Sequence, residues 1–268
     1  MNRSKTVGEH QARKRFGQNF LVDNNIIEKI VSAIAPTPNQ NLIEIGPGQG
    51  AITGPVLEKC PRLNVIELDR DLIPLLQKKF HQYPELHIHQ GDALKTDFSQ
   101  FYREGKPLRI IGNLPYNIST PLMFHLLSFS GQISDMYFML QKEVVTRLAA
   151  VPGDKNYGRL SIMVQYYCQV EPLFQVPPTA FRPAPKVESA IVRLLPYPEP
   201  PYPADDLQLL SRLVRACFQQ RRKTMRNTLK HMLNAEQLEQ LGIDLTRRPE
   251  TLSVEDFVVL SNQIGALL

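Results

Sequence analysis

Hydrophobic positions between residues 24 and 140 follow two alternating patterns. Short apolar runs that end at glycine, proline or polar residues are typical of buried strands, and they occur at residues 42–45, 63–68, 86–89, 108–111 and 136–140. Segments with a helical spacing of apolar residues lie among them, at residues 26–34, 71–80 and 121–129. Strands separated by helices of this length form right-handed βαβ units. We therefore predict an α/β fold with a central, mainly parallel sheet and helices on both faces.

A dense run of prolines follows between residues 193 and 206. The prolines of this segment are Pro196, Pro198, Pro200, Pro201 and Pro203. Because proline neither donates to a strand ladder nor continues a helix, the run predicts a stiff linker. Beyond it no further strand is evident, and apolar positions recur with helical spacing at Leu207, Leu210, Leu213, Val214, Cys217 and Phe218. We expect a boundary near residue 200, between a larger domain over residues 24–200 and a small helical domain over residues 201–268.

The composition narrows the class of protein only a little. Hydrophobic residues make up 43% and charged residues 21%, with a formal net charge of +5, which suits a nucleic-acid partner but occurs in many enzymes that bind none. No apolar run approaches the length of a membrane span. Residues 1–23 are basic without an apolar stretch, which predicts a basic arm rather than a secretory signal. Cys60, Cys168 and Cys217 form no CxxC pair, so we expect no disulfide framework or zinc site, and a cytoplasmic location.

A glycine-rich loop, Glu44–Gly50, directly follows the first strand and precedes a helix. Glycines there let the backbone turn sharply and approach a ligand, although a tight strand–helix turn without a ligand would look the same. Glu67 ends the second strand, where a carboxylate can accept hydrogen bonds from both ribose hydroxyls, and Asp92 follows the third. Because ligands bind at the carboxyl ends of parallel strands, we expect Gly46, Gly48, Glu67 and Asp92 to converge on a nucleoside site.

The segment Asn113–Tyr116, with the sequence NLPY, follows the fourth strand and indicates the chemistry. The lone pair of an adenine amino group is delocalised into the ring, so that nitrogen is a poor nucleophile. Oxygens from the Asn113 side chain and the Leu114 backbone would favour pyramidal nitrogen, while Pro115 fixes the loop and Tyr116 stacks on the base. Rate would come from positioning and oriented dipoles rather than from a strong base. The alternative interpretation is a plain strand-to-helix turn with an asparagine cap.

These motifs together resemble a known family. In order along the chain they are residues 14–21 (KRFGQNFL), the Gly46–Gly50 loop, Asn113–Tyr116, residues 181–187 (FRPAPKV) and residues 220–227 (QRRKTMRN). They are similar to those of the ribosomal RNA adenine N6,N6-dimethyltransferases, and most similar to the bacterial small-subunit type. The resemblance runs from about residue 10 to residue 230. No departure is found at the positions that carry the chemistry. The resemblance implies a Rossmann-like class I methyltransferase fold and S-adenosyl-L-methionine as the methyl donor.

The resemblance also implies roles for individual residues. The positions matching the donor site of the family are Gln18, Asn19, Leu21, Gly46, Gly48, Glu67, Asp92 and Asn113. The positions matching its catalytic site are Asn113, Leu114, Tyr116 and Phe181. The target adenine would lie between Tyr116 and Phe181, and the basic arm over residues 1–23 would close over the donor. From the residues alone Phe181 favours a core position, whereas between Pro178 and Pro183 it is also plausible as an exposed stacking face on a rigid loop.

A basic stretch in the C-terminal part is the candidate RNA contact. Its members are Arg212, Arg215, Arg221, Arg222, Lys223, Arg226 and Lys230, with no acidic residue between its ends. We expect Arg221, Arg222, Lys223 and Arg226 to bind RNA phosphates, against the alternative of a solvated helix face. His81, His87 and His89 lack convincing ligand spacing, so no metal is implied.

The expected function is dimethylation of two adjacent adenosines in the 3′-terminal hairpin of small-subunit (16S) ribosomal RNA, within a pre-assembled 30S particle, by a monomer that binds no membrane. The nearest alternative is the macrolide-resistance type of enzyme, which modifies large-subunit RNA and shares the catalytic segments. A non-catalytic RNA-binding assembly factor is the second alternative, disfavoured by intact Gly46, Glu67, Asp92 and Asn113. DNA adenine and glutamine methyltransferases usually carry a second proline where this chain has Leu114.

Overall fold

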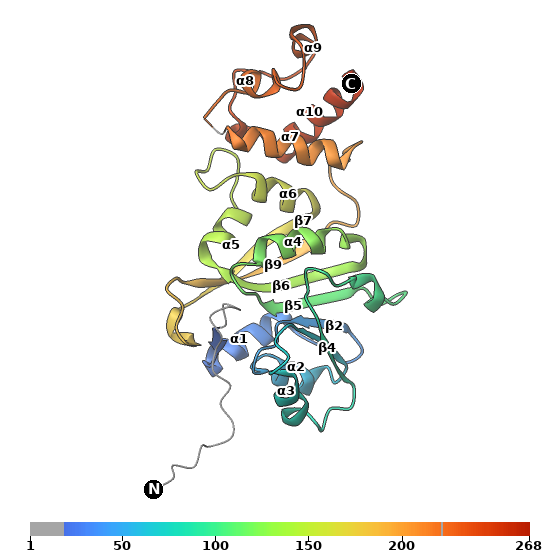
Figure 1. Ribbon diagram of the computed structural model, residues 1–268, viewed down its shortest axis with the longest axis vertical. Helices are drawn as coiled ribbons and strands as arrows, with labels where there is room; N and C mark the ends of the chain where they lie inside the picture. The colour runs from blue at the N-terminus through green and yellow to red at the C-terminus, as the bar shows by residue number, and fades with distance from the viewer. Residues whose placement is uncertain (1–18, 221) are drawn as a thin grey trace. The chain divides into compact units, whose positions relative to one another are not determined.

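The computed structural model describes residues 19–220 and 222–268 (Figure 1). Within them the chain forms two compact units. The first comprises residues 19–142 and Leu173–Arg193, and the second comprises Glu143–Pro172 and Leu194–Leu268. Two sheets are present, one of seven strands in the order β4-β3-β2-β5-β6-β9-β7 and one that pairs β1 with β8.

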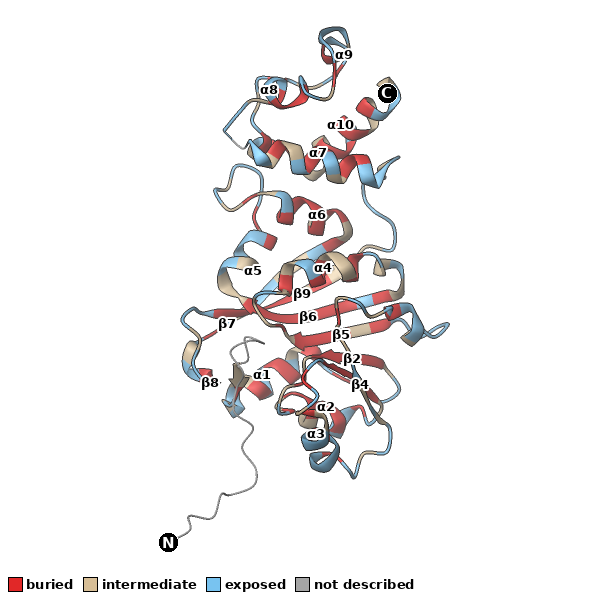
Figure 2. Ribbon diagram, viewed as in Figure 1, coloured by how far each residue is buried: buried red, intermediate tan, exposed pale blue. Residues whose placement is uncertain are grey.

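The five strands predicted from the apolar runs are present and parallel. They are β2 (Asn41–Ile45), β3 (Leu63–Glu67), β4 (Leu86–Gln90), β5 (Leu108–Asn113) and β6 (Ile133–Gln141). Every residue of β2 and β3 is buried, which requires cover on both faces of the sheet, as Figure 2 shows by the red strands. The α/β fold with a mainly parallel sheet is therefore confirmed.

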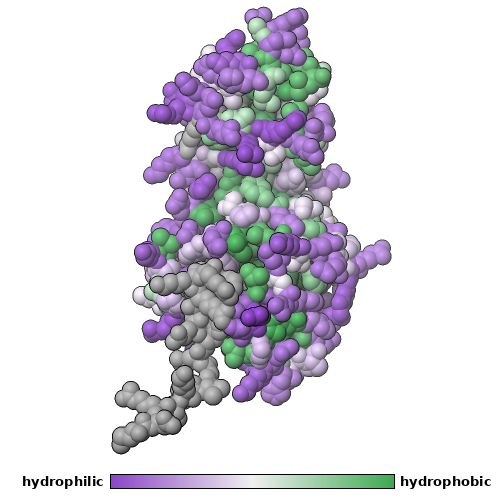
Figure 3. All heavy atoms as spheres, viewed as in Figure 1, coloured by the Kyte–Doolittle hydropathy of each residue, from purple (hydrophilic) through white to green (hydrophobic). Residues whose placement is uncertain are grey.

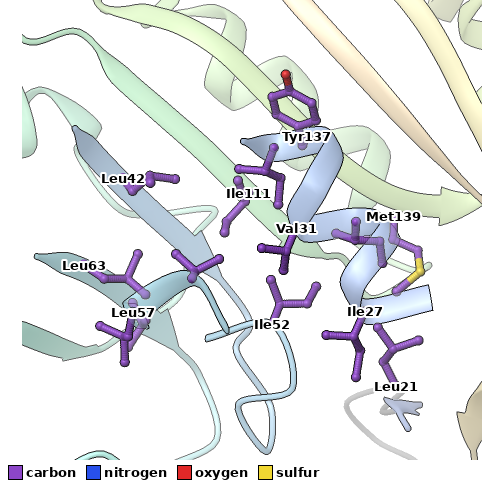
Figure 4. Packing of buried hydrophobic residues seen from close by; sticks show 14 of the residues in the cluster. Leu21, Ile27, Val31, Leu42, Ile52, Leu57, Leu63, Ile111, Tyr137 and Met139 are labelled. Carbon is purple, nitrogen blue, oxygen red and sulfur yellow. The ribbon is translucent and has the colours of Figure 1, made fainter. Parts of the chain in front are cut away.

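The described residues of the first unit contain four α-helices: α1 (Asn24–Ile34), α2 (Thr53–Lys59), α3 (Ile73–Lys79) and α4 (Ser119–Leu127). Helix α1 begins where the Asp23 carboxylate accepts the amide hydrogen of Ile26, at 3.2 Å, and it ends at Ala35 in the left-handed conformation. Its apolar stripe packs on the sheet, and Figure 4 shows Ile27 and Val31 in one cluster with residues of β5 and β6. This layer fixes β2 and β5, the strands that carry the glycine loop and Asn113.

Four strands lie outside the predicted set. They are β1 (Phe20–Leu21), β7 (Cys168–Val176), β8 (Phe181–Arg182) and β9 (Ser189–Pro196). The expectation that the linker begins at Arg193 is wrong, because β9 continues to Pro196. Proline is tolerated there because it is the last residue of the strand, where the ladder ends.

The second unit is helical but is not the continuous segment expected from the sequence. It contains α6 (Arg159–Tyr167), α7 (Leu207–Gln219), α8 (Met225–Leu229), α9 (Ala235–Glu239) and α10 (Val254–Leu267), and most of α5 (Lys142–Leu148). Helix α6 packs against α7 and α10. Because the helical spacing of apolar residues does not reveal which surface covers them, the sequence placed α6 with the larger domain. None of the helices in the described ranges is long and apolar enough to cross a membrane.

Candidate donor and adenine site

A cavity of about 320 Å³ lies in the first unit, at the carboxyl ends of the parallel strands. This is where ligands bind in open α/β sheets. The predicted site residues that line it are Asn19, Leu21, Gly46, Gly48, Glu67, Asp92, Asn113, Leu114 and Tyr116. Gln18 lies outside the described residues. The structure thus brings together side chains from four strand ends that are distant in sequence.

The glycine loop adopts backbone conformations that favour glycine. Gly46 and Gly48 have φ angles of +67° and +57°, in the left-handed region. A Cβ atom on Gly48 would lie 3.2 Å from the Phe20 ring, closer than an ordinary contact. The loop therefore presents bare backbone to the cavity, with Phe20 of β1 packed against it.

Glu67 fastens this loop to the end of β3. The side chain is 6% exposed, and its two carboxylate oxygens accept the amide hydrogens of Gly48, at 3.2 Å, and Asp69, at 2.8 Å. Burial raises the pKa of Glu67 above its ordinary value, and these two hydrogen bonds oppose the rise. The result is a carboxylate held in a fixed orientation on the cavity wall, with lone pairs left for hydroxyl donors.

Glu44 is a further acidic residue of this site. The sequence analysis includes it in the glycine-rich loop but predicts no role for it. It lines the cavity, is 2% exposed, and accepts a hydrogen bond of 2.6 Å from the Thr53 hydroxyl. Burial raises its pKa to about 7, with a further rise from the charge of Glu67 and an opposing effect of Thr53. The sequence signal that could have identified Glu44 as a site residue is an acidic side chain inside the otherwise apolar strand predicted at residues 42–45.

Asp92 follows β4 and stands in a tight turn. Its carboxylate accepts the amide hydrogen of Leu94 at 3.0 Å, and its backbone carbonyl accepts from the Thr96 hydroxyl at 3.0 Å. These bonds hold the side chain at the cavity edge beside Gly91 and Ala93. The turn thereby supplies a second fixed carboxylate, one strand further along the sheet than Glu67.

Asn113 is the last residue of β5 and the first of the NLPY segment. Its amide Nδ2 donates to the backbone carbonyl of Asn19, at 3.3 Å. This bond leaves Oδ1 without a hydrogen-bond partner among the residues that the structure describes, so an acceptor oxygen is available at the cavity. Leu114 is anchored by its amide, which donates to the Met139 carbonyl of β6 at 3.2 Å.

Tyr116 is half-buried on the cavity wall. Its phenolic oxygen lies 2.8 Å from the Ser189 hydroxyl at the start of β9, and Ser189 is fully buried. No pattern in the sequence predicts this contact, because Tyr116 and Ser189 lie far apart in the chain.

Phe181 is not placed as an exposed aromatic, and that expectation is wrong. The side chain is 3% exposed, belongs to the apolar cluster that contains Leu21, and is absent from the residues that line the cavity. The reason is the pairing of β8 with β1, which sets Leu21 opposite Phe181 and covers the ring. The core position favoured by the residues alone is the observed one.

The basic residues belong to the second unit. Arg221 lies outside the described residues. Arg222, Lys223 and Arg226 are exposed around the start of α8, and Figure 3 shows hydrophilic side chains over that helix. Within the described residues, no group of His, Cys, Asp and Glu side chains is arranged to hold a metal ion.

Fold and site together define a class I S-adenosylmethionine-dependent methyltransferase. The model of the family "Ribosomal RNA adenine dimethylase" matches residues 9–265. The chain therefore belongs to the ribosomal RNA adenine dimethylase family.

Individual relatives agree with the family. The chain is 63% identical to the ribosomal RNA small subunit methyltransferase A of Marinobacter nauticus, covering 96% of this chain and 92% of that protein. It is 59% identical to the protein of the same name from Pseudomonas aeruginosa, covering 97% of each. A dimethyladenosine transferase from Plasmodium falciparum has a similar structure, with a TM-score of 0.78 and 29% identity over 91% of this chain and 98% of that one. The 23S rRNA methyltransferase ErmE shares the fold, with a TM-score of 0.70 and 23% identity over 92% and 100%.

Proposed function

We propose that this protein transfers methyl groups from S-adenosyl-L-methionine to N6 of two adjacent adenosines in the 3′-terminal hairpin of 16S ribosomal RNA, giving N6,N6-dimethyladenosine. The observation that carries the proposal is the single cavity shared by the glycine loop, two fixed carboxylates and the NLPY segment. Membership of the adenine dimethylase family supports the base and the reaction. The names of the most similar relatives support the small ribosomal subunit.

The residues present fit the methyl donor. Gly46 and Gly48 leave open a cradle that a Cβ would narrow. Glu67 orients its carboxylate toward ribose hydroxyls, and Asp92 lies one strand further along, where the nucleoside base would extend. Asn19, directly before β1, and Leu21 of β1 line the same cavity. The bound donor supplies an electrophilic methyl group on a positively charged sulfur, and the acidic wall formed by Glu44, Glu67 and Asp92 suits that charge.

The NLPY segment prepares the acceptor nitrogen. Asn113 Oδ1 and the Leu114 carbonyl accept hydrogen bonds from the adenine amino group, which aligns the nitrogen lone pair with the methyl carbon. A nitrogen–carbon bond forms as the carbon–sulfur bond breaks, and a neutral thioether leaves. The positive charge then on N6 is relieved by loss of a proton to water, so no strongly basic side chain is required. Tyr116 supplies a stacking face for the base.

RNA outside the active site meets the helical unit. Arg222, Lys223 and Arg226 are exposed and have no ion-pair partner in the described part of the chain, so they are available to phosphates. Arg221 is included in this surface on its sequence position alone. We propose a monomer that acts on a pre-assembled 30S particle, where the hairpin is presented with its protein surroundings.

The test uses small and large ribosomal subunits from cells whose ribosomal RNA lacks N6,N6-dimethyladenosine. The purified protein is incubated with them and with S-adenosylmethionine, and the nucleosides of both ribosomal RNAs are analysed by mass spectrometry. N6,N6-Dimethyladenosine in 16S RNA is the expected result. Product only in large-subunit RNA would assign the chain to the macrolide-resistance type. If no product forms but RNA binding is intact, the chain would be a non-catalytic assembly factor. The matched variant Asn113→Ala should abolish transfer and keep RNA affinity.

A further inference from the structure

The hydroxyl of Ser189 is a buried polar group outside the set of residues that line the cavity. It is fully buried at the first residue of β9 and lies 2.8 Å from the phenolic oxygen of Tyr116. Tyr116 lines the donor and adenine cavity, whereas Ser189 does not. A buried hydroxyl without a partner destabilises the protein, so this contact satisfies both groups, but it also joins the cavity wall to a strand behind it.

The backbone directly before Ser189 is held in place by two interactions. Directly before it, the Glu188 carbonyl accepts the amide hydrogen of Lys142 at 2.9 Å, and the Lys142 ammonium lies 2.7 Å from the Glu188 carboxylate. Ser189 is thereby held beside the end of β6, and its hydroxyl has a defined position. The Ser189 hydroxyl is therefore a hydrogen-bond partner of fixed position for the Tyr116 phenol.

The Tyr116 end is held on its backbone side as well. Ser119 donates its hydroxyl hydrogen to the Tyr116 carbonyl at 3.2 Å, and the Ile118 amide donates to the Pro115 carbonyl at 3.1 Å. These bonds fix where the side chain leaves the loop, and Ser189 fixes where the phenol ends. With both ends restrained, the ring has little freedom to rotate or swing into the cavity.

We propose that Ser189 is a positioning residue for methyl transfer, which holds the Tyr116 ring as a fixed stacking face and matters most for the second methyl group. This rests on the proposed function. After the first transfer, N6 carries a methyl group that prefers the plane of the base, and it must turn to present its lone pair again. Fewer positions of the base then allow in-line transfer. A Tyr116 ring that can move therefore slows the second transfer more than the first.

The experiment compares Ser189→Ala with Ser161→Ala. Ser161 is also fully buried with its hydroxyl bonded, donating to the Arg147 carbonyl, but it belongs to α6 in the other unit. Both steps are followed in single turnovers on small subunits with saturating donor. We expect Ser189→Ala to slow the second transfer about tenfold, because the hydrogen bond that positions the Tyr116 ring is lost. The first transfer should be slowed less. N6-Methyladenosine should accumulate, while donor affinity stays constant and Ser161→Ala keeps the wild-type product ratio.

Tyr116→Phe keeps the ring and removes only the hydroxyl, so it tests the same contact if Ser189→Ala folds poorly. The single and double variants should show the same ratio of mono- to dimethylated product, because each removes one contact. Additive effects, or equal ratios in Ser189→Ala, Ser161→Ala and the wild type, would overturn the positioning role and leave the proposed function intact. Failure of the wild-type protein to form N6,N6-dimethyladenosine in 16S RNA would overturn both.

Discussion

Glu44→Gln should make the protein less sensitive to pH between pH 5 and pH 8. The carboxyl group is 2% exposed and its pKa is raised from 4.5 to about 7. Below pH 4.5 it is protonated in the folded and the unfolded chain alike. As the pH rises toward 7 the unfolded chain ionises first, so the unfolding free energy of the wild-type protein falls. Above pH 7 the folded protein carries the full penalty of a buried charge, about 3 kcal/mol for a rise of this size.

Glutamine is nearly isosteric and still accepts the hydrogen bond from Thr53, but it does not ionise. The stability difference between Glu44→Gln and the wild type should therefore increase by about 2 to 3 kcal/mol from pH 5 to pH 8. Urea unfolding of the ligand-free proteins, followed by circular dichroism at several pH values, measures it. Ligand must be absent, because a cation in the cavity would favour the ionised carboxylate. Glu28→Gln, an exposed residue of α1, is the control. Parallel pH profiles of Glu44→Gln and the wild type would refute the reasoning.

Three further substitutions have expected outcomes. Gly48→Ala places a Cβ 3.2 Å from the Phe20 ring at a φ of +57°, and should weaken donor binding in calorimetry about tenfold; unchanged affinity would show that the loop does not shape the cavity. Asp135→Ala removes the carboxylate that lies 2.8 Å from the Arg109 guanidinium, in a pair whose side chains are 13% (Arg109) and 9% (Asp135) exposed. This substitution should lower the unfolding free energy by about 3 kcal/mol. Asp71→Ala, in the exposed pair with Arg70, is the control and should lower it by less than about 1 kcal/mol. Tyr157→Phe should leave stability unchanged or raised, since the buried hydroxyl has no partner among the described residues, and a loss above about 1 kcal/mol would contradict this.

The sequence predicted the parallel core well because its strands are buried on both faces. Residues 42–45 and 63–68 are mostly apolar runs, and their ends identify the site through the rule that ligands bind at the carboxyl ends of strands. Strand β7 was missed because several of its residues are exposed, which weakens the apolar pattern.

The contacts that complete the site were beyond the reach of a sequence pattern. The bond between Tyr116 and Ser189, and the pairing that buries Phe181 against Leu21, join segments with no local relation. Glu44 shows a different limit, since its raised pKa depends on the degree of burial and on the neighbouring charge of Glu67. Spacing along the chain records neither quantity.

The pairing of β1 with β8 also sets the order in which the protein is completed during synthesis. Phe20 leaves the ribosome early, yet its partner Arg182 is translated only after the five parallel strands β2 to β6. Until then Asn19, Phe20 and Leu21 lack the strand that holds them over the glycine loop and beside Asn113. All five parallel strands of the central sheet are therefore translated before the strand that closes the donor site. The growing protein acquires its affinity for the donor late, as one of the last properties of the first unit.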